Sequence, residues 1–220
     1  MNSKLKAILS IPKIVWVNFR YLPFKQAIKI PILIAYNADF KCVRREGVRL
    51  DAPISFGMIH IGFFTMNVCN PKDKTIVDVK GSLVFKGKAA LGHGTKITVY
   101  KSCEMILGDS FHVSGYSSFV CKKKMVFGNN VLFGWECLTM DGDGHTIYDI
   151  NNQPMIGKRE VVFGDNVWVG CRCTILKGAL IPSGSIIGAG TIIAGQKFEP
   201  QSIIAGNPPH VIKKISRWKM

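Results

Sequence analysis

The chain has 220 residues, of which 47% are hydrophobic and 20% charged. This balance excludes intrinsic disorder as the main state and suits one globular domain, alone or with an appendage. The formal net charge of +15 favours polyanionic partners, such as nucleic acid, anionic lipid or a phosphorylated cofactor.

The first fifty residues carry most of the positive charge. They hold ten Lys or Arg and two acids, a net of +8, whereas residues 126–220 have a net of only +2. Prolines at 12, 23 and 31 predict that residues 1–51 form a basic, apolar segment of short helices. The basic residues alternate with apolar ones rather than with stacking aromatics, which argues against nucleic acid. Peripheral contact of residues 1–50 with anionic lipid remains an alternative.

Seven cysteines and the absence of a secretory signal predict a reducing environment with free thiols. No stretch approaches the roughly 18–20 apolar residues that span a bilayer. We therefore expect a cytoplasmic protein, with peripheral attachment to the inner face of the membrane left open.

A period of six residues begins at Phe163. The first positions of the hexads are large and apolar: Phe163, Val169, Ile175, Ile181, Ile187 and Ile193. The fifth positions are small or β-branched: Val167, Cys173, Ala179, Ser185 and Thr191. This period fits neither a helix nor a flat strand, and it is typical of a parallel β-helix with three hexads per coil. Large first residues would fill the prism, and small fifth residues would lie beside its corners.

The repeat predicts an all-β chain in three parts. Weaker hexads at 127–138 and 107–118 extend the β-helix to residues 52–206. The segment 140–160 is rich in Gly, Asp and Asn and predicts a loop that leaves the prism; such long loops are usually functional. Residues 207–220 are predicted to form a short C-terminal helix that begins at two prolines. Its apolar face would consist of Val211, Ile212, Ile215 and Trp218.

Four further motifs accompany the hexads: Asp141-x-Asp143-x-His145, the Val-Trp-Val-Gly run that ends at Gly170, Gly188-Ala-Gly and Gly206-Asn-Pro. Together these motifs resemble the left-handed β-helix acyltransferases of the hexapeptide-repeat superfamily, in particular the sugar O-acetyltransferases of galactoside, capsule or lipopolysaccharide biosynthesis. The resemblance covers about 127–214. It implies the left hand of the coil, a homotrimer, and acetyl-CoA in the groove between neighbouring prisms.

The resemblance also implies a set of cofactor-binding residues: Trp168, Gly170, Cys171, Ala189, Ala194, Gly195, Lys197, Asn207, Pro208 and Lys213. The backbone N–H near Cys171 would bind the oxyanion, and Gly170 would let the pantetheine approach closely. Trp168 is as readily a surface aromatic that covers the prism. The chain departs from the family at 194–197 and at Pro209-His210, where the family contacts the nucleotide end of CoA.

His145 is the predicted general base. Acyl transfer to a sugar hydroxyl needs a group that takes the hydroxyl proton, and the unperturbed pKa of histidine suits that task. Asp141 or Asp143 would orient its ring or stabilise the imidazolium. His93 and His112 lie inside coils and are expected to be structural or to line a groove.

Three alternatives remain. On the same fold, the acceptor atom could be the nitrogen of an amino sugar. A γ-carbonic-anhydrase-like site would need three zinc histidines, and the sequence lacks the His-x₄-His spacing. A membrane-binding β-helix without an enzymatic role would use the basic segment. We predict no metal, because Cys171 and Cys173 have neither a second thiol pair nor a nearby histidine to complete four ligands.

Overall fold

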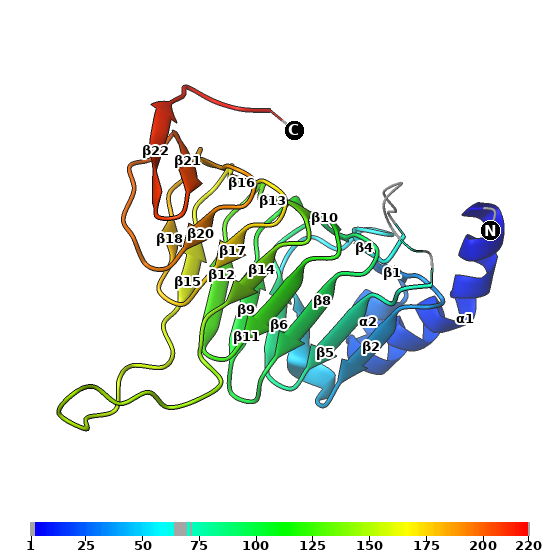
Figure 1. Cartoon of the computed structure of the whole chain (residues 1–220). Coiled ribbons are helices and arrows are strands. Elements are labelled where there is room, and N and C mark those ends of the chain that lie inside the picture. Colours follow the sequence, from blue (N-terminus) through cyan, green and yellow to red (C-terminus); the bar gives the residue numbers. More distant parts are fainter. Residues whose placement is uncertain (1–2, 64–69, 71, 220) are drawn as a thin grey trace.

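The computed structural model describes residues 3–63, 70 and 72–219. Its body is a three-sided stack of short strands with helices at its N-terminal end (Figure 1). From β1 to β21, consecutive strands lie in different sheets, and strands of successive coils pair in parallel. The predicted parallel β-helix is confirmed.

In the described residues the stack consists of three sheets. Sheet A contains β1 (Ile32–Ile34), β4 (Ile59–Ile61), β7 (Ala89–Leu91), β10 (Phe111–Gly115), β13 (Leu132–Trp135), β16 (Trp168–Val169), β19 (Ile186–Ile187), β21 (Ser202–Gly206) and β22 (Pro209–Lys214). Sheet B contains β2 (Asp39–Cys42), β5 (Ile76–Val79), β8 (Lys96–Val99), β11 (Ser118–Cys121), β14 (Leu138–Met140), β17 (Thr174–Ile175) and β20 (Ile192–Ile193). Sheet C contains β3 (Val48–Leu50), β6 (Ser82–Phe85), β9 (Glu104–Leu107), β12 (Lys124–Phe127), β15 (Val161–Phe163) and β18 (Leu180–Ile181).

The hexad positions play the expected parts. Every first position from Phe163 to Ile193 is at most 2% exposed, and every fifth position from Val167 to Thr191 is completely buried. From β15 to β20, paired residues are 18 apart in sequence, as in Trp168 and Ile186. Earlier coils are longer, as the pairing of His112 with Leu132 shows. Longer corners explain why the repeat is weaker upstream.

Aromatic rings fill the middle of the prism. Phe111, Phe119, Phe127, Phe133 and Phe163 are buried, with neighbouring ring centroids between 4.9 and 6.0 Å apart. Burying each such side chain stabilises the fold by about 1.5–3 kcal/mol, and edge-to-face contacts add to this. The core is therefore continuous across several coils.

The N-terminal segment differs from the prediction. Helix α1 (Ser3–Tyr21) runs through Pro12 instead of breaking there, and is followed by α2 (Phe24–Ala27). The β-helix begins at β1 rather than at residue 52, and a 3₁₀ turn, η1 (Arg45–Gly47), precedes β3. Val17 and Leu22 are completely buried, so the two helices cover the apolar end of the stack. These tertiary contacts outweigh the local effect of Pro12.

The predicted C-terminal helix is wrong. Residues Pro209–Lys214 form strand β22, which turns back at Asn207 and Pro208 and pairs antiparallel with β21. The last parallel strand of sheet A would otherwise expose a row of unpaired backbone groups, and pairing satisfies them. Val211 and Ile212 consequently remain exposed instead of packing on the prism.

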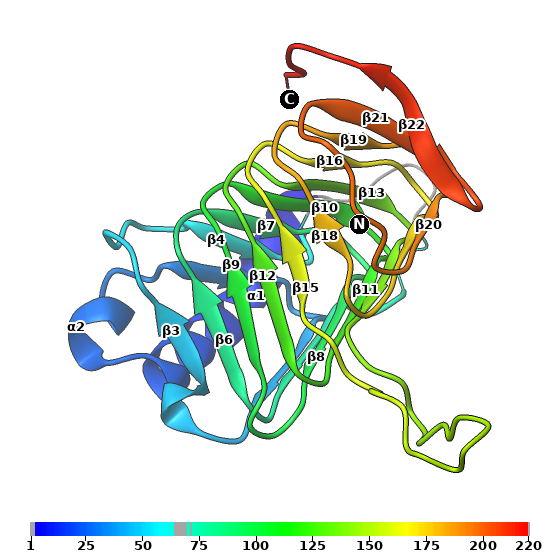
Figure 2. The ribbon, with the colours of Figure 1, turned by 90° about the vertical axis from the view of Figure 1, so that its left-hand side faces the viewer.

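A long excursion leaves the prism between β14 and β15. It occupies residues 141–160 and projects from the edge that joins sheets B and C (Figures 1 and 2). Two antiparallel bridges, Gly142 with Lys158 and Tyr148 with Pro154, hold its two legs together. Its apolar side chains lie in solvent, and Ile150 is 100% exposed.

Within the described residues, no helix is both long enough and apolar enough to cross a membrane.

Candidate active site

Asp141 lies at the root of the excursion and is completely buried. Its carboxylate accepts hydrogen bonds from the backbone N–H groups of Lys122 at 2.6 Å and Lys123 at 2.9 Å. The Cys121 thiol lies 3.6 Å away, and burial together with this carboxylate raises the pKa of that thiol. Asp141 thus holds the corner at 121–124, and its carboxylate is bonded to backbone N–H groups there.

We expect Asp141→Ala to lower the free energy of unfolding by about 2–4 kcal/mol, because it leaves two N–H groups without their charged acceptor. Asp143→Asn is the matched control and should cost less than about 1 kcal/mol, since only a partly exposed ion pair is lost. Chemical denaturation of both variants checks this. Equal stability of the two variants would contradict the structural role of Asp141.

Asp143 fastens the excursion to the prism. It forms an ion pair with Lys177, whose ammonium also donates to the carbonyl of Ile156 at 3.2 Å. Lys122 donates to the carbonyl of Asp143 at 3.3 Å. A cavity of about 150 Å³ lies beside this ion pair and is bordered by Ala194 and Arg159. Both legs of the excursion are therefore tied to the corners that follow β11 and β17.

Sequence reasoning missed Lys177. It is the only charged residue between Arg172 and Lys197, in a run that is otherwise apolar, small or neutral. A single charged residue in such a run is expected to have a partner of opposite charge, and this expectation could have identified Lys177.

His145 lies on the excursion and is exposed. Both aspartates predicted to orient its ring have other partners: Asp141 binds backbone N–H groups, and Asp143 binds Lys177. Among the described residues, none forms a hydrogen bond to the His145 ring. The chain thus presents an imidazole on a projecting arm, close in sequence to two carboxylates that stiffen the root of that arm.

A second group of predicted residues lies on sheet A and on the edge that joins sheets A and B. Trp168 is 40% exposed on β16, and its ring centroid lies 6.1 Å from that of Trp218. The indole N–H of Trp218 donates to the carbonyl of Asn166 at 2.6 Å, which ties the C-terminal tail to this coil. Trp168 therefore packs against the tail while part of its ring remains open to solvent.

Glycines recur at the A–B edge for a packing reason. A Cβ atom on Gly170 would lie 2.7 Å from the backbone nitrogen of Ala189, and one on Gly134 would lie 2.8 Å from that of Cys171. Coils stacked about 4.8 Å apart leave no room for a side chain there. Gly170 is thus required for stacking of the prism, whatever ligand it meets. Ala189 is exposed, and a Cβ on Gly190 would meet nothing within 4 Å, so this corner presents a smooth open surface.

The remaining predicted residues lie after β20. Ala194 and Gly195 are exposed at the B–C edge, close to the root of the excursion, and Lys197 borders a hollow of about 410 Å³ over sheet C. Asn207, Pro208 and Lys213 lie on the β21–β22 hairpin and are exposed or partly exposed. In one chain, the predicted site residues are therefore divided among two edges of the prism and its C-terminal end.

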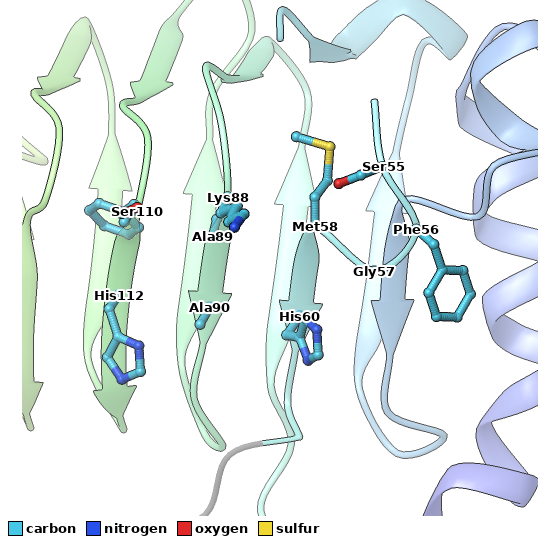
Figure 3. Close-up of a pocket in the computed structure, with 11 residues that line it drawn as sticks. Ser55, Phe56, Gly57, Met58, His60, Lys88, Ala89, Ala90, Ser110 and His112 are labelled. Atoms are coloured by element: carbon cyan, nitrogen blue, oxygen red, sulfur yellow. The ribbon is translucent and has the colours of Figure 1, made fainter. Parts of the chain in front are cut away.

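Another hollow, of about 470 Å³, lies on sheet A nearer the N-terminal end (Figure 3). His60, Ala90 and His112 are in register on β4, β7 and β10, so the small Ala90 separates two imidazole rings. Burial lowers the pKa of His112, which favours its neutral form. The expectation that His112 lines a groove agrees with this position, and sequence reasoning assigned no role to His60. His93 is buried and contacts the carbonyl of Asn70 through Nε2 at 2.8 Å.

Metal ligands do not gather in the described part of the chain: no group of three or more His, Cys, Asp or Glu side chains there could hold an ion. Cys173 is buried, and its thiol donates to the carbonyl of Gly188 at 3.0 Å.

Solved structures with a similar fold include acetyltransferases and an N-acyltransferase. The polysialic-acid-specific acetyltransferase NeuO is 20% identical, with a TM-score of 0.55, over 86% of this chain and 89% of its own. The polysialic acid O-acetyltransferase OatWY is 19% identical, with a TM-score of 0.45, over 81% and 86%. A point mutant of AntD, an N-acyltransferase from Bacillus cereus in complex with dTDP and coenzyme A, is 15% identical, with a TM-score of 0.45, over 88% and 90%.

Neither a protein-family model nor a curated protein matches the sequence. The likeness to NeuO shows the fold: the chain is a left-handed parallel β-helix, as expected. The fold class predicted from the hexads and from the family resemblance is thereby confirmed.

Proposed function

We propose that the protein transfers an acetyl group from acetyl-CoA to a hydroxyl of a sugar or surface-glycan precursor, with His145 as general base. The observation that carries this proposal is the excursion, which projects from the B–C edge (Figure 2). It carries the exposed His145, and the ion pair of Asp143 with Lys177 holds its root. A smooth small-residue surface lies on the next edge, at 188–190. The acetyltransferase activity in NeuO's name agrees with this reading.

The residues present fit a nucleotide-tailed thioester. Ala189 and Gly190 are exposed and without bulk, so a slender pantetheine arm can lie along the A–B edge; Ala194 and Gly195 are exposed at the B–C edge. Lys197 and Lys213 are exposed cations that suit phosphate groups. Acetyl-CoA would supply an activated acetyl group on a good leaving thiol. Trp168 and Cys171 would lie beside it at the A–B edge.

Each catalytic task is assigned to a group of this chain. His145 takes the proton of the acceptor hydroxyl through a ring nitrogen as its oxygen attacks the carbonyl carbon, and returns that proton to the departing sulfur. The backbone N–H of Cys171 stabilises the negative charge that develops on the carbonyl oxygen. Asp143 and Asp141 act on His145 only through the backbone, because they hold the root of the arm.

The site requires a second copy of the chain. His145 and Cys171 lie on different edges of the prism, with sheet B between them. The arm also exposes Ile147, Tyr148 and Ile150, apolar side chains that a neighbouring prism would bury. We infer a homotrimer in which the arm of one copy reaches the A–B edge of the next, which closes the assembly with identical interfaces.

Thiol release from acetyl-CoA, measured with sugars, nucleotide sugars and lipid-linked glycans, tests the proposal. We expect release that depends on an acceptor hydroxyl, and thermal stabilisation of the protein by CoA. Amino sugars and their deoxy analogues decide between oxygen and nitrogen as the acceptor atom. Absence of both thiol release and CoA stabilisation would refute the proposal.

A further inference from the structure

Helix α1 exposes most of its large apolar side chains, whereas several of its polar side chains lie toward the protein, beside the buried Val17 and Tyr21. Ser10 and Asn18 are completely buried, and Lys6 and Lys13 are half-buried. The exposed large residues of the same helix are Leu5, Ile8, Leu9, Ile11, Val15, Trp16 and Phe19. A surface helix normally has the opposite arrangement.

The inward polar groups satisfy the first coil of the prism. Asn18 bonds both ways with Ile32, donating to its carbonyl at 2.8 Å and accepting from its N–H at 3.1 Å. Lys13 donates to the carbonyl of Ala38 at 2.8 Å, and Lys6 donates to that of Gly62 at 2.8 Å. Burial lowers the pKa of Lys6. The edge of β1 is thus closed by side chains, which fixes the rotation of α1.

With this rotation, seven large apolar side chains of α1 face solvent. Helix α2 extends this surface, because the rings of Phe19 and Phe24 lie 6.0 Å apart and Ile28 is also exposed. We call the nine exposed residues from Leu5 to Ile28 the apolar end face. It lies at the opposite end of the stack from β22 (Figure 1).

The charged residues of α1 and α2 and of the chain up to residue 38 have one sign. Arg20, Lys25 and Lys29 are exposed beside the apolar end face, and residues 1–38 contain no Asp or Glu. Apolar side chains, an exposed tryptophan and flanking cations are the features by which interfacial helices bind anionic bilayers. A second copy would bring the same cations against each other.

We propose that the apolar end face docks on an anionic lipid surface, with α1 in the plane of the headgroups and the prism projecting away from it. This is independent of the acyl-transfer proposal, because none of its residues belongs to the candidate active site. Trp16, Phe19 and Phe24 enter the acyl boundary, while Arg20, Lys25 and Lys29 contact lipid phosphates.

Co-sedimentation of the full chain with vesicles tests the proposal. We expect binding to vesicles of phosphatidylglycerol and phosphatidylcholine and far weaker binding to phosphatidylcholine alone. Neutralising Arg20, Lys25 and Lys29 to Gln should weaken binding by roughly two orders of magnitude, at about 1 kcal/mol for each cation. Trp16→Ser with Phe19→Ser should weaken it at least about tenfold, whereas the matched control Leu180→Ser, at the other end of the prism, should bind as wild type.

Tryptophan emission provides a second readout. A blue shift on vesicle binding should vanish in Trp16→Phe, which retains the apolar ring and should still sediment with the vesicles. Equal binding of all variants would overturn the proposal. So would a fall in molar mass by light scattering for Trp16→Ser with Phe19→Ser in the absence of lipid, since the face would then be an interface between copies.

Discussion

His145→Ala is expected to lower the rate of acetyl transfer by a factor on the order of 10²–10⁴, because the proton of the acceptor hydroxyl loses its base. Stability should be unchanged, since the His145 side chain is exposed and no described residue is hydrogen-bonded to it. The measurements are kcat for thiol release and the denaturation midpoint of the purified variant.

His60→Ala is the informative companion. His60 belongs to the other histidine-lined hollow, on sheet A (Figure 3). We expect it to retain wild-type kcat, which would show that the loss in His145→Ala is specific to the excursion. If His60→Ala were inactive and His145→Ala active, the active site would instead lie in the hollow lined by His60, Ala90 and His112.

Two inactive variants are expected to restore activity when they assemble together. His145→Ala removes the base from the arm, and Ala189→Glu places bulk and negative charge on the exposed corner that would receive the thioester. If one copy supplies the arm and its neighbour the corner, a random equal mixture has both intact in roughly one site in four. Activity should therefore rise from near zero to about a quarter of the wild-type rate.

The mixture is made by co-refolding or by co-expression with two affinity tags, and thiol release is measured on the doubly tagged assembly. Each variant subjected alone to the same procedure is the control. No recovery in verified mixed assemblies would show that both residues act within one chain, and the inferred use of two copies would be wrong.

Periodicity revealed the C-terminal coils because their geometry is local. Each hexad meets the same neighbours one coil above and below, so the same residue classes recur at Phe163 and Ile187. Toward the N-terminus the coils lengthen and contain phenylalanines at irregular intervals. The six-residue pattern is therefore no longer recognisable in the first coils, although the β-helix begins at β1. The terminal elements depended on contacts that no repeat describes.

The roles of the two aspartates were beyond sequence reasoning. Asp141 and Asp143 are two residues apart in the same motif. Asp141 is buried and accepts hydrogen bonds from the backbone N–H groups of Lys122 and Lys123, whereas Asp143 forms an ion pair with Lys177. Their partners lie 18 to 34 residues away in sequence. Only the stacking of coils brings these groups within bonding distance.

The amino-acid sequence by itself determined the stacked three-sided scaffold, the position of the excursion and the histidine on it, because each follows from a short-range pattern or its interruption. The tertiary structure alone decided that α1 turns its apolar side outward, that β22 is a strand and that the candidate residues lie on separate edges. These features arise where unpaired backbone groups at the ends of the stack, and corners brought together by coiling, select partners distant in sequence.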